Sequence, residues 1–194
     1  MTAAARPEPD EQLARRARAG DESAFANLVE RHQRAAFNFA FRFLGDYDEA
    51  SDAAQSGFVQ FFISLPGLDL SRPIKPWLFR TIRNRCIDTL RQRRSVSLDT
   101  GVRQDEGELP AFSDRLADPD PLPDEIAERA DVQQLLSAAI RRLPDRYRES
   151  VALRYTTDMT FGEIASALGV PENTARIHFH RAKALLREAL RELM

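Results

Sequence analysis

Residues 160–191 read TFGEIASALGVPENTARIHFHRAKALLREALR and predict two helices joined by a tight turn. Thr160 followed three residues later by Glu163 forms a capping box, in which each side chain satisfies a free backbone N–H of the other residue. The segment Gly169-Val170-Pro171 predicts the turn, because glycine ends helices and proline cannot continue one. A short helix, a glycine turn and a longer helix are typical of the helix-turn-helix unit.

The second helix of this unit carries a cationic outer face. With Ala175, Phe179, Ala182 and Leu186 turned inward, the residues predicted to face DNA are Arg176, Ile177, His180, Arg181 and Lys183. Cationic groups bind phosphate and set register, and residues near the start of a recognition helix reach base edges in the major groove. Ile177 can touch a thymine methyl or make a packing contact. His178 and His180 are two residues apart and point to different sides, so they predict no metal site.

A second basic helix is predicted over residues 73–94, PIKPWLFRTIRNRCIDTLRQRR, with Pro76 in its first turn. Leu78, Ile82, Cys86 and Leu90 recur at helical spacing and form an apolar stripe. The opposite side carries Arg80, Arg83, Asn84, Asp88 and Arg91. A solvated charged face is the alternative interpretation. The predominance of arginine over lysine favours contact with phosphates and base edges.

The rest of the chain predicts helices only, with no alternating β-branched runs. Helices are expected over 10–19, over 22–44 with Asp21 as its cap, and from Asp46 or Asp48 to the Pro66-Gly67 break. His32 falls on an inner stripe and is expected to be packed or hydrogen-bonded. Gly57 lies inside the third helix, where we expect close packing or contact with a partner.

Residues 96–123 lose all periodicity, are acidic and contain several prolines, so a linker is predicted there. Beyond it, helices are expected over 124–143 and from Asp145, which is expected to cap its helix. The sequence therefore predicts an all-α protein: domain 1–95, an acidic, Pro-containing linker 96–123, and a helix-turn-helix domain 124–194.

The composition excludes several classes of protein. The 194 residues carry a formal net charge of -2, so any nucleic-acid signal must be local rather than global. The single cysteine excludes an internal disulfide and fits a reducing cytoplasm. We find no apolar run of membrane-spanning length and no signal peptide, and we predict a cytoplasmic protein without membrane insertion. No Gly-rich phosphate loop or nucleophile elbow is present, so we predict no enzyme, cofactor or metal.

Four stretches taken together resemble one protein family. They are LGDYDEASDAAQSGF (44–58), PWLFRTIRNRCIDTLR (76–91), RLPDRYRESVALRY (142–155) and FGEIASALGVPENTARIHFHRAKALLRE (161–188). In this order they resemble the bacterial RNA polymerase sigma factors of the extracytoplasmic-function (ECF) group. The resemblance covers both predicted domains, whereas a helix-turn-helix alone is shared by many regulators.

This resemblance implies a role for each part. The first domain would bind the clamp helices of the largest subunit of core RNA polymerase through Asp48, Asp52 and Gln55. It would read the promoter −10 element as a melted strand, with loop 67–75 and Asn84 holding a flipped base and Arg80, Arg83, Asp88 and Arg91 along the DNA. Trp77 is expected in the core rather than as a melting wedge. Family members usually carry an acidic residue at Ser56 and a bulkier one at Gly57, so this chain departs there.

The second domain would read the −35 element as duplex DNA through its recognition helix and contact the polymerase flap. The linker would run toward the active-site and RNA-exit channels, and an anti-sigma factor is expected to hold the protein inactive. Two other classes stay open: an autonomous helix-turn-helix regulator that dimerises on palindromic operators, and a pure interaction protein whose basic helices dock acidic partners.

Overall fold

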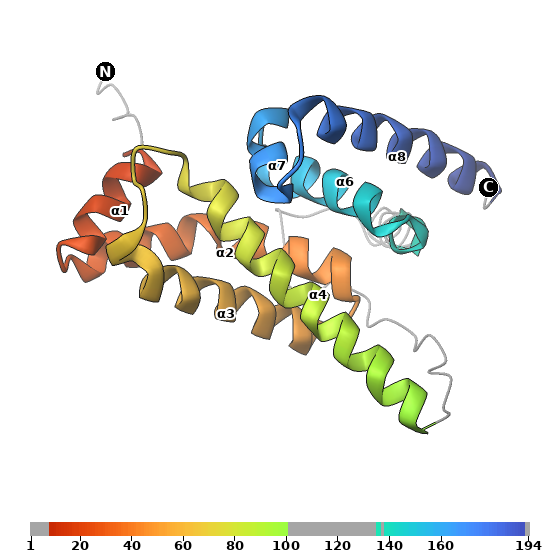
Figure 1. Cartoon of the computed structure of the whole chain (residues 1–194), viewed down its shortest axis with the longest axis horizontal. Helices are drawn as coiled ribbons and strands as arrows, with labels where there is room; N and C mark the ends of the chain where they lie inside the picture. The colour runs from red at the N-terminus through yellow and green to blue at the C-terminus, as the bar shows by residue number, and fades with distance from the viewer. Residues whose placement is uncertain (1–7, 101–134, 137, 193–194) are drawn as a thin grey trace, which may run out of the picture.

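The computed structural model describes residues 8–100, 135–136 and 138–192, and every regular element among them is helical (Figure 1). The N-terminal domain consists of α1 (Asp10–Arg18), α2 (Glu22–Leu44), α3 (Tyr47–Ser64), the 3-10 turn η1 (Leu65–Gly67) and α4 (Ile74–Thr100). The C-terminal domain consists of α6 (Asp145–Thr157), α7 (Phe161–Leu168) and α8 (Glu172–Glu192), preceded by helical turns within 135–142. None of the described helices is both long and apolar enough to cross a bilayer.

The predicted caps fix where the N-terminal helices begin and end. The Asp21 carboxylate accepts the Ala24 N–H at 3.2 Å at the start of α2, and Gly45 ends this helix with φ 72°. A side chain would be strained at that angle, which is why glycine stands there. Of the two residues proposed to start the third helix, Asp46 is the cap, and it accepts the Glu49 N–H at 2.9 Å.

Helix α4 is longer than the sequence predicted. Residues 96–100 were expected to begin the linker, but α4 continues to Thr100. No proline or glycine interrupts the chain until Gly101, so nothing in these residues forces the helix to end. The remainder of the predicted linker, 101–123, lies outside the described residues, as does most of the helix predicted over 124–143.

The helix-turn-helix forms as predicted. Both hydrogen bonds of the Thr160–Glu163 capping box are present, and Gly169 ends α7 with φ 69°. The prediction that Asp145 caps α6 was wrong. Pro144 is the cap residue, and Asp145 is the first helical residue, with its carboxylate 2.7 Å from the Arg148 guanidinium instead of on a backbone N–H.

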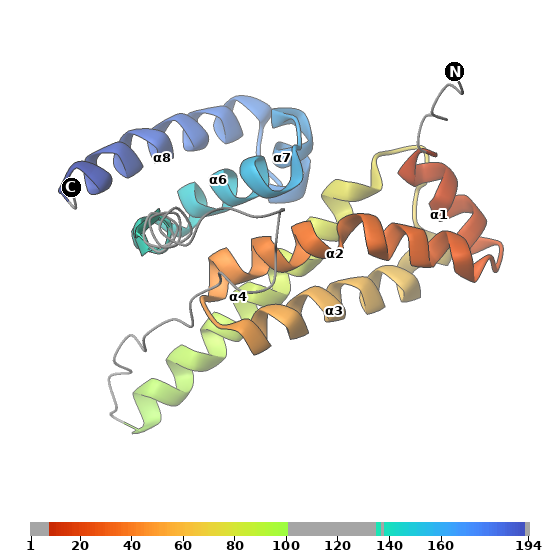
Figure 2. The same cartoon turned by 180° about the vertical axis from the view of Figure 1, so that it is seen from behind.

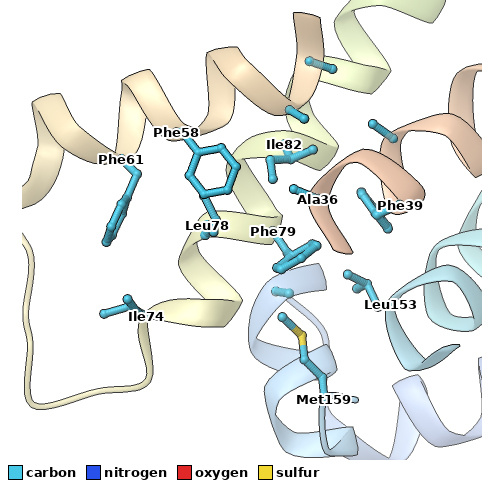
Figure 3. Close-up of a cluster of buried hydrophobic side chains, with 14 of the residues drawn as sticks. Ala36, Phe39, Phe58, Phe61, Ile74, Leu78, Phe79, Ile82, Leu153 and Met159 are labelled. Atoms are coloured by element: carbon cyan, nitrogen blue, oxygen red, sulfur yellow. The ribbon is translucent and has the colours of Figure 1, made fainter. Parts of the chain in front are cut away.

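The two domains pack against each other, which the sequence did not predict. Figures 1 and 2 both show α6–α8 as a group alongside α2 and α4, and the packed pairs are α2 with α6 and α4 with α7. Leu153 of α6 and Met159, in the turn before α7, are fully buried in the same cluster as Phe39 and Phe79 of the N-terminal domain (Figure 3). The C-terminal domain also has a smaller core of its own, which includes Tyr147. One continuous apolar cluster therefore joins both halves of the chain.

Candidate nucleic-acid interface

The recognition helix α8 presents its predicted DNA face to solvent. Ala175, Phe179, Ala182 and Leu186 are buried against α6 and α7. That packing leaves Arg176, Ile177, His180 and Arg181 exposed on the opposite side. Ile177 is 41% exposed, so its side chain is accessible from the solvent side of α8.

Arg176 is held in place on this face. Its guanidinium lies 3.0 Å from the Glu172 carboxylate and 5.4 Å from the centroid of the Phe161 ring. The ion pair is more than half exposed, so it contributes little to stability but limits the directions in which the arginine points. Arg176 is thus positioned near the start of the helix, where base contacts are made.

Lys183 and His178 are less exposed than these four residues. Lys183 is half-buried, with its ammonium 5.8 Å from the Phe179 ring centroid, and at seven residues after Arg176 it lies on the same side of the helix, two turns further along. The His178 ring packs edge-on against Tyr147, and its Nδ1 is buried without a hydrogen-bond partner among the described residues. Burial, with the charges of Arg146 and Arg181, lowers the pKa of His178. Within the described part of the chain, no cluster of His, Cys, Asp and Glu could hold a metal.

The predicted DNA face of α4 divides into two sides. Arg80 and Arg83 point toward the C-terminal domain. Arg80 donates to the backbone carbonyls of Ser166 and Ala167, the latter at 3.3 Å, and Arg83 forms an ion pair with Glu149 at 2.9 Å. These two arginines are therefore occupied by the chain itself.

Asn84 and Asp88 lie on the other side of α4, facing α3. They line a groove of about 620 Å³ whose opposite wall includes Asp52 and Gln55. Arg91 is exposed one turn further along, 3.7 Å from the Asp88 carboxylate. The structure thus brings residues predicted for DNA and residues predicted for polymerase to the two walls of one groove.

Gly57 explains how α3 and α4 come so close at this groove. A Cβ at position 57 would lie 2.3 Å from Cγ1 of Ile82, which is a severe overlap. Ile82 is fully buried, so it has little room to move away. Close packing, one of the two alternatives for this glycine, accounts for it. Gly57 and Ser56 also line the groove, where larger residues would narrow it.

The exposed face of α3 is acidic in its first half and apolar in its second. Asp48, Asp52 and Gln55 are all exposed, as their predicted role requires. The same face continues into Val59, Phe62 and Ile63, which are 58%, 56% and 65% exposed. The sequence analysis did not single out these three side chains as exposed, although their spacing of three and four residues was a readable signal.

Loop 67–75 is held against α1 and does not meet Asn84. Arg15 donates to the Leu70 carbonyl at 2.9 Å, Arg18 to the Leu68 carbonyl at 3.2 Å, and the Ile74 N–H donates to Glu11. The groove lined by Asn84 contains no residue of this loop. Trp77 is half-buried against the core with its ring 5.7 Å from that of Phe61, in agreement with a packing role.

Two other residues noted in the sequence, His32 and Cys86, are buried in the core. His32 is buried and its Nε2 lies 2.7 Å from the Asp10 carboxylate, so it is a hydrogen-bonded core histidine. Cys86 is fully buried, and burial raises the pKa of its thiol to about 12. Lys75 and Glu149, by contrast, were not singled out from the sequence, because their roles depend on contact between the domains.

Known proteins match both domains in the same order. The Sigma-70 region 2 family model matches residues 28–96, and the Sigma-70 region 4 model matches residues 133–186. The chain is 31% identical over 175 residues to the ECF RNA polymerase sigma factor SigW of Bacillus subtilis, a match covering 90% of this chain and 92% of SigW. It is 27% identical to the RNA polymerase sigma-H factor of Pseudomonas aeruginosa, with 96% of each chain covered.

Two solved structures share the fold. CnrH, determined in complex with the cytosolic domain of CnrY, is 26% identical, with a TM-score of 0.70 and coverage of 95% of this chain and 99% of CnrH. The sigma factor RpoE of Bartonella quintana, determined in complex with the anti-sigma factor NepR, gives a TM-score of 0.69 at 21% identity, covering 86% of this chain and 96% of RpoE.

Proposed function

Because the chain belongs to the ECF group of RNA polymerase sigma factors, we propose that α8 reads the −35 element as duplex DNA and that α4 reads the −10 element as a melted strand. The observation that carries the proposal is the pairing of two separate cationic helices, each in the family region expected to touch DNA. A regulator that binds DNA through one helix-turn-helix would not need a second cationic helix such as α4.

The geometry of α8 supports the −35 assignment. Arg176, Ile177, His180 and Arg181 are exposed together, which provides both fork-shaped donors for guanine edges and an apolar group for a thymine methyl. Lys183 is better suited to a phosphate, since it is half-buried and lies two turns beyond Arg176, away from the start of the helix where bases are reached.

The −10 assignment is supported by Asn84, Asp88 and Arg91, which are exposed on α4. Holding a flipped base costs a few kcal/mol of stacking, so the residues that accept it must be fixed in place. The anchoring of loop 67–75 to α1 supplies that rigidity. Since this loop and Asn84 lie at separate places, we propose that they contact different nucleotides of the strand.

Core polymerase would bind the exposed face of α3. Asp48, Asp52 and Gln55 offer two carboxylates and an amide along nearly two helical turns, which suits a basic helical partner such as the clamp helices. The C-terminal domain would contact the flap.

We further propose that a separate anti-sigma factor controls the protein. Two proteins of the same fold were solved with a second protein bound: RpoE with the anti-sigma factor NepR, and CnrH with the cytosolic domain of CnrY.

Run-off transcription with purified core polymerase tests the proposal. A library of upstream fragments from the source genome is transcribed with core enzyme alone and with core enzyme plus this chain. We expect discrete start sites only when the chain is present. Equal initiation without the chain, or tight sequence-specific duplex binding by the chain without polymerase, would contradict the assignment.

Asn84 provides a sharper test within that assay. Asn84→Ala is expected to reduce initiation from a duplex promoter more than from the same promoter with a pre-melted −10 region, since only the duplex must be opened. Arg85→Ala is the matched control, because Arg85 also lines the groove but has no predicted base contact. Equal loss on both templates would remove Asn84 from the opening step.

A further inference from the structure

The hydroxyl group of Tyr147 lies beside the recognition helix. Tyr147 is in the first turn of α6 and belongs to the smaller core of the C-terminal domain, where it is 7% exposed. Nη1 of Arg181, on α8, donates to the Tyr147 hydroxyl oxygen at 3.4 Å. A residue of α6 therefore contacts one of the exposed arginines with which α8 is proposed to read DNA.

Packing fixes the position of this hydroxyl group. The Tyr147 ring lies among the residues of the smaller core and meets the His178 ring edge-on, with the two centroids 5.5 Å apart. The Arg146 guanidinium lies 4.8 Å from the centroid of the Tyr147 ring. A buried ring that is held on several sides has few rotamers open to it, so its hydroxyl oxygen is a fixed acceptor.

His178 holds the ring without adding a charge beside it. Burial, with the charges of Arg146 and Arg181, lowers the pKa of His178, so its imidazole is mostly neutral at pH 7. The hydroxyl oxygen itself faces cations: the hydrogen bond from Arg181, with the charge of Arg146, outweighs burial and lowers the pKa of Tyr147. Both shifts fit an arrangement in which the arginines, and not the histidine, carry the positive charge around the phenol.

A phenol anchors an arginine differently from a carboxylate. Arg176, at the start of α8, is paired with Glu172, whose negative charge offsets part of its own. The protonated phenol of Tyr147 has no charge and engages one of the five donors of the Arg181 guanidinium, so the full charge and the other donors stay free for DNA. The bond is also long for a hydrogen bond, so Arg181 can adjust its direction when it meets DNA.

An arginine that is directed before binding is better suited to reading a base. A free, exposed arginine samples many rotamers, and ordering it on DNA costs conformational entropy. A side chain that already points one way loses less freedom on binding and reaches fewer of the alternative base edges. Arg181 is exposed and is bonded to a neighbouring helix, so its direction is set by α6 as well as by α8.

We propose that Tyr147 is a positioning residue for −35 recognition: its hydroxyl group directs Arg181 toward one base and thereby sets the preference at that position. The inference deepens the proposed role of α8 and rests on it. Tyr147 acts only through Arg181, so removal of its hydroxyl group should have no effect on base preference where Arg181 is absent.

Initiation by core polymerase with full-length variants, on a library of −35 sequences, tests this role. The position read by Arg181 is the one at which Arg181→Ala changes the preference. Tyr147→Phe removes only the hydroxyl group and keeps the buried ring, and it should relax the preference at that same position several-fold. The double variant Tyr147→Phe/Arg181→Ala should match Arg181→Ala.

Tyr155→Phe is the matched control. It makes the same chemical change on the same helix, at a side chain that is 57% exposed and lies against the Phe179 ring, so the profile should stay as in wild type. The proposal is overturned by a wild-type profile in Tyr147→Phe, by a uniform loss at all positions, or by a further loss of preference in the double variant. An Arg181→Ala variant that changes no single position would overturn it as well.

Carbon-13 NMR of the tyrosine rings in the free chain checks the contact without polymerase or DNA. The chain has three tyrosines, so the Tyr147 signal is identified by its loss in Tyr147→Phe. Because the bond from Arg181 lowers the pKa of Tyr147, this signal should titrate at higher pH in Arg181→Ala than in wild type. Arg187→Ala, at an exposed position further along α8, should titrate as wild type does. The same titration in Arg181→Ala and wild type would overturn the contact.

The two experiments separate the inference from the function on which it rests. If the NMR titration shifts but wild type gives no promoter-specific initiation, the proposed function fails. If wild type initiates specifically and Tyr147→Phe keeps the wild-type profile, only this inference fails.

Discussion

At the scale of single residues, Gly57 shows how one missing methyl group sets the distance between two helices. Alanine would be favoured over glycine inside a helix by about 1 kcal/mol. Here the overlap of a Cβ with Ile82 at 2.3 Å outweighs that preference, because Ile82 is β-branched and fully buried and cannot easily change rotamer.

Gly57→Ala is therefore expected to lower the free energy of unfolding by up to about 2 kcal/mol, which is the typical cost of overpacking (about 1–3 kcal/mol) less the gain in helix propensity (about 1 kcal/mol). Urea denaturation of Gly57→Ala, Ile82→Ala and the double variant measures this. The double variant should be less destabilised than the sum of the single variants, since removing Ile82 leaves room for the new methyl group. Gly67→Ala is the control, because a Cβ there meets nothing within 4 Å. Additive losses would show that Ile82 is not the obstacle.

Asp10 is the second residue with a clear energetic role. Burial raises the pKa of its carboxyl group, but bonds and charges from His32 and Arg31 outweigh burial and hold the pKa below the ordinary 3.8. A carboxyl whose pKa is lower in the folded than in the unfolded state stabilises the fold above 3.8, and the stabilisation is lost as the pH falls through the lowered pKa.

Asp10→Asn should thus destabilise the protein at pH 7, by about 1–3 kcal/mol as for other hydrogen bonds to charged groups, and by progressively less below pH 3.8. Denaturant midpoints of wild type and variant across pH 7 to pH 2.5 provide the comparison. Asp52→Asn, at an exposed position on α3, should follow wild type throughout. A deficit that is independent of pH would mean that the carboxylate charge is not the cause.

Local chemistry explains which residue-level features could be predicted. The caps at Asp21 and Thr160 depend only on neighbouring backbone, so the sequence was sufficient for them. Gly57 was recognised as unusual but not assigned, because its partner is 25 positions away in the chain. The burial of Glu149 gave no local signal at all, since its cause is a contact with Arg83 from the other domain.

At the scale of elements, α4 and α8 differ in how far their amphipathic pattern could be interpreted. For both, periodicity separated an apolar stripe from a cationic side. For α8 that side is the free surface, whereas the cationic side of α4 is wide enough to serve two neighbours, the α3 groove and the C-terminal domain. A helical wheel shows which residues face away from the stripe, but not which of them another domain covers.

The arrangement of α8 leads to a graded prediction for promoter binding. Arg176→Ala and Arg181→Ala should each weaken use of the −35 element by about 1–3 kcal/mol if the side chain reads a base, and should relax the preference at one position. Lys183→Ala should weaken all sequences alike and by less, since a half-buried lysine two turns beyond Arg176 is suited to a phosphate and not to a base. Initiation rates on a library of −35 variants measure all three. An unchanged preference in both arginine variants would refute the assignment of α8.

At the scale of the whole molecule, the all-helical class and the two groups of helices could be predicted because each helix is specified by its own residues. The docking of the two groups could not. It depends on a few non-local contacts, such as Met159 with Phe79 and Arg80 with Ala167, whose members look like ordinary core or surface residues in the sequence. These contacts also join part of the C-terminal domain to the core of the N-terminal domain, while the smaller core around Tyr147 stays separate.

A shared cluster should make the two domains unfold together. Trp77 is the single tryptophan and lies in the N-terminal domain, so its fluorescence follows that domain alone, and a dye on Ala184→Cys follows the C-terminal domain. In wild type we expect the two probes to give the same urea midpoint, because cooperative units unfold in one transition.

Met159→Ala removes a fully buried side chain between the domains, at a cost of about 2–5 kcal/mol. It should shift the dye transition to lower urea than the Trp77 transition. Val59→Ala, at an exposed position on α3, should leave the two midpoints together. Separate midpoints in wild type would mean that the two domains unfold independently, and the apolar cluster that they share would then not couple them.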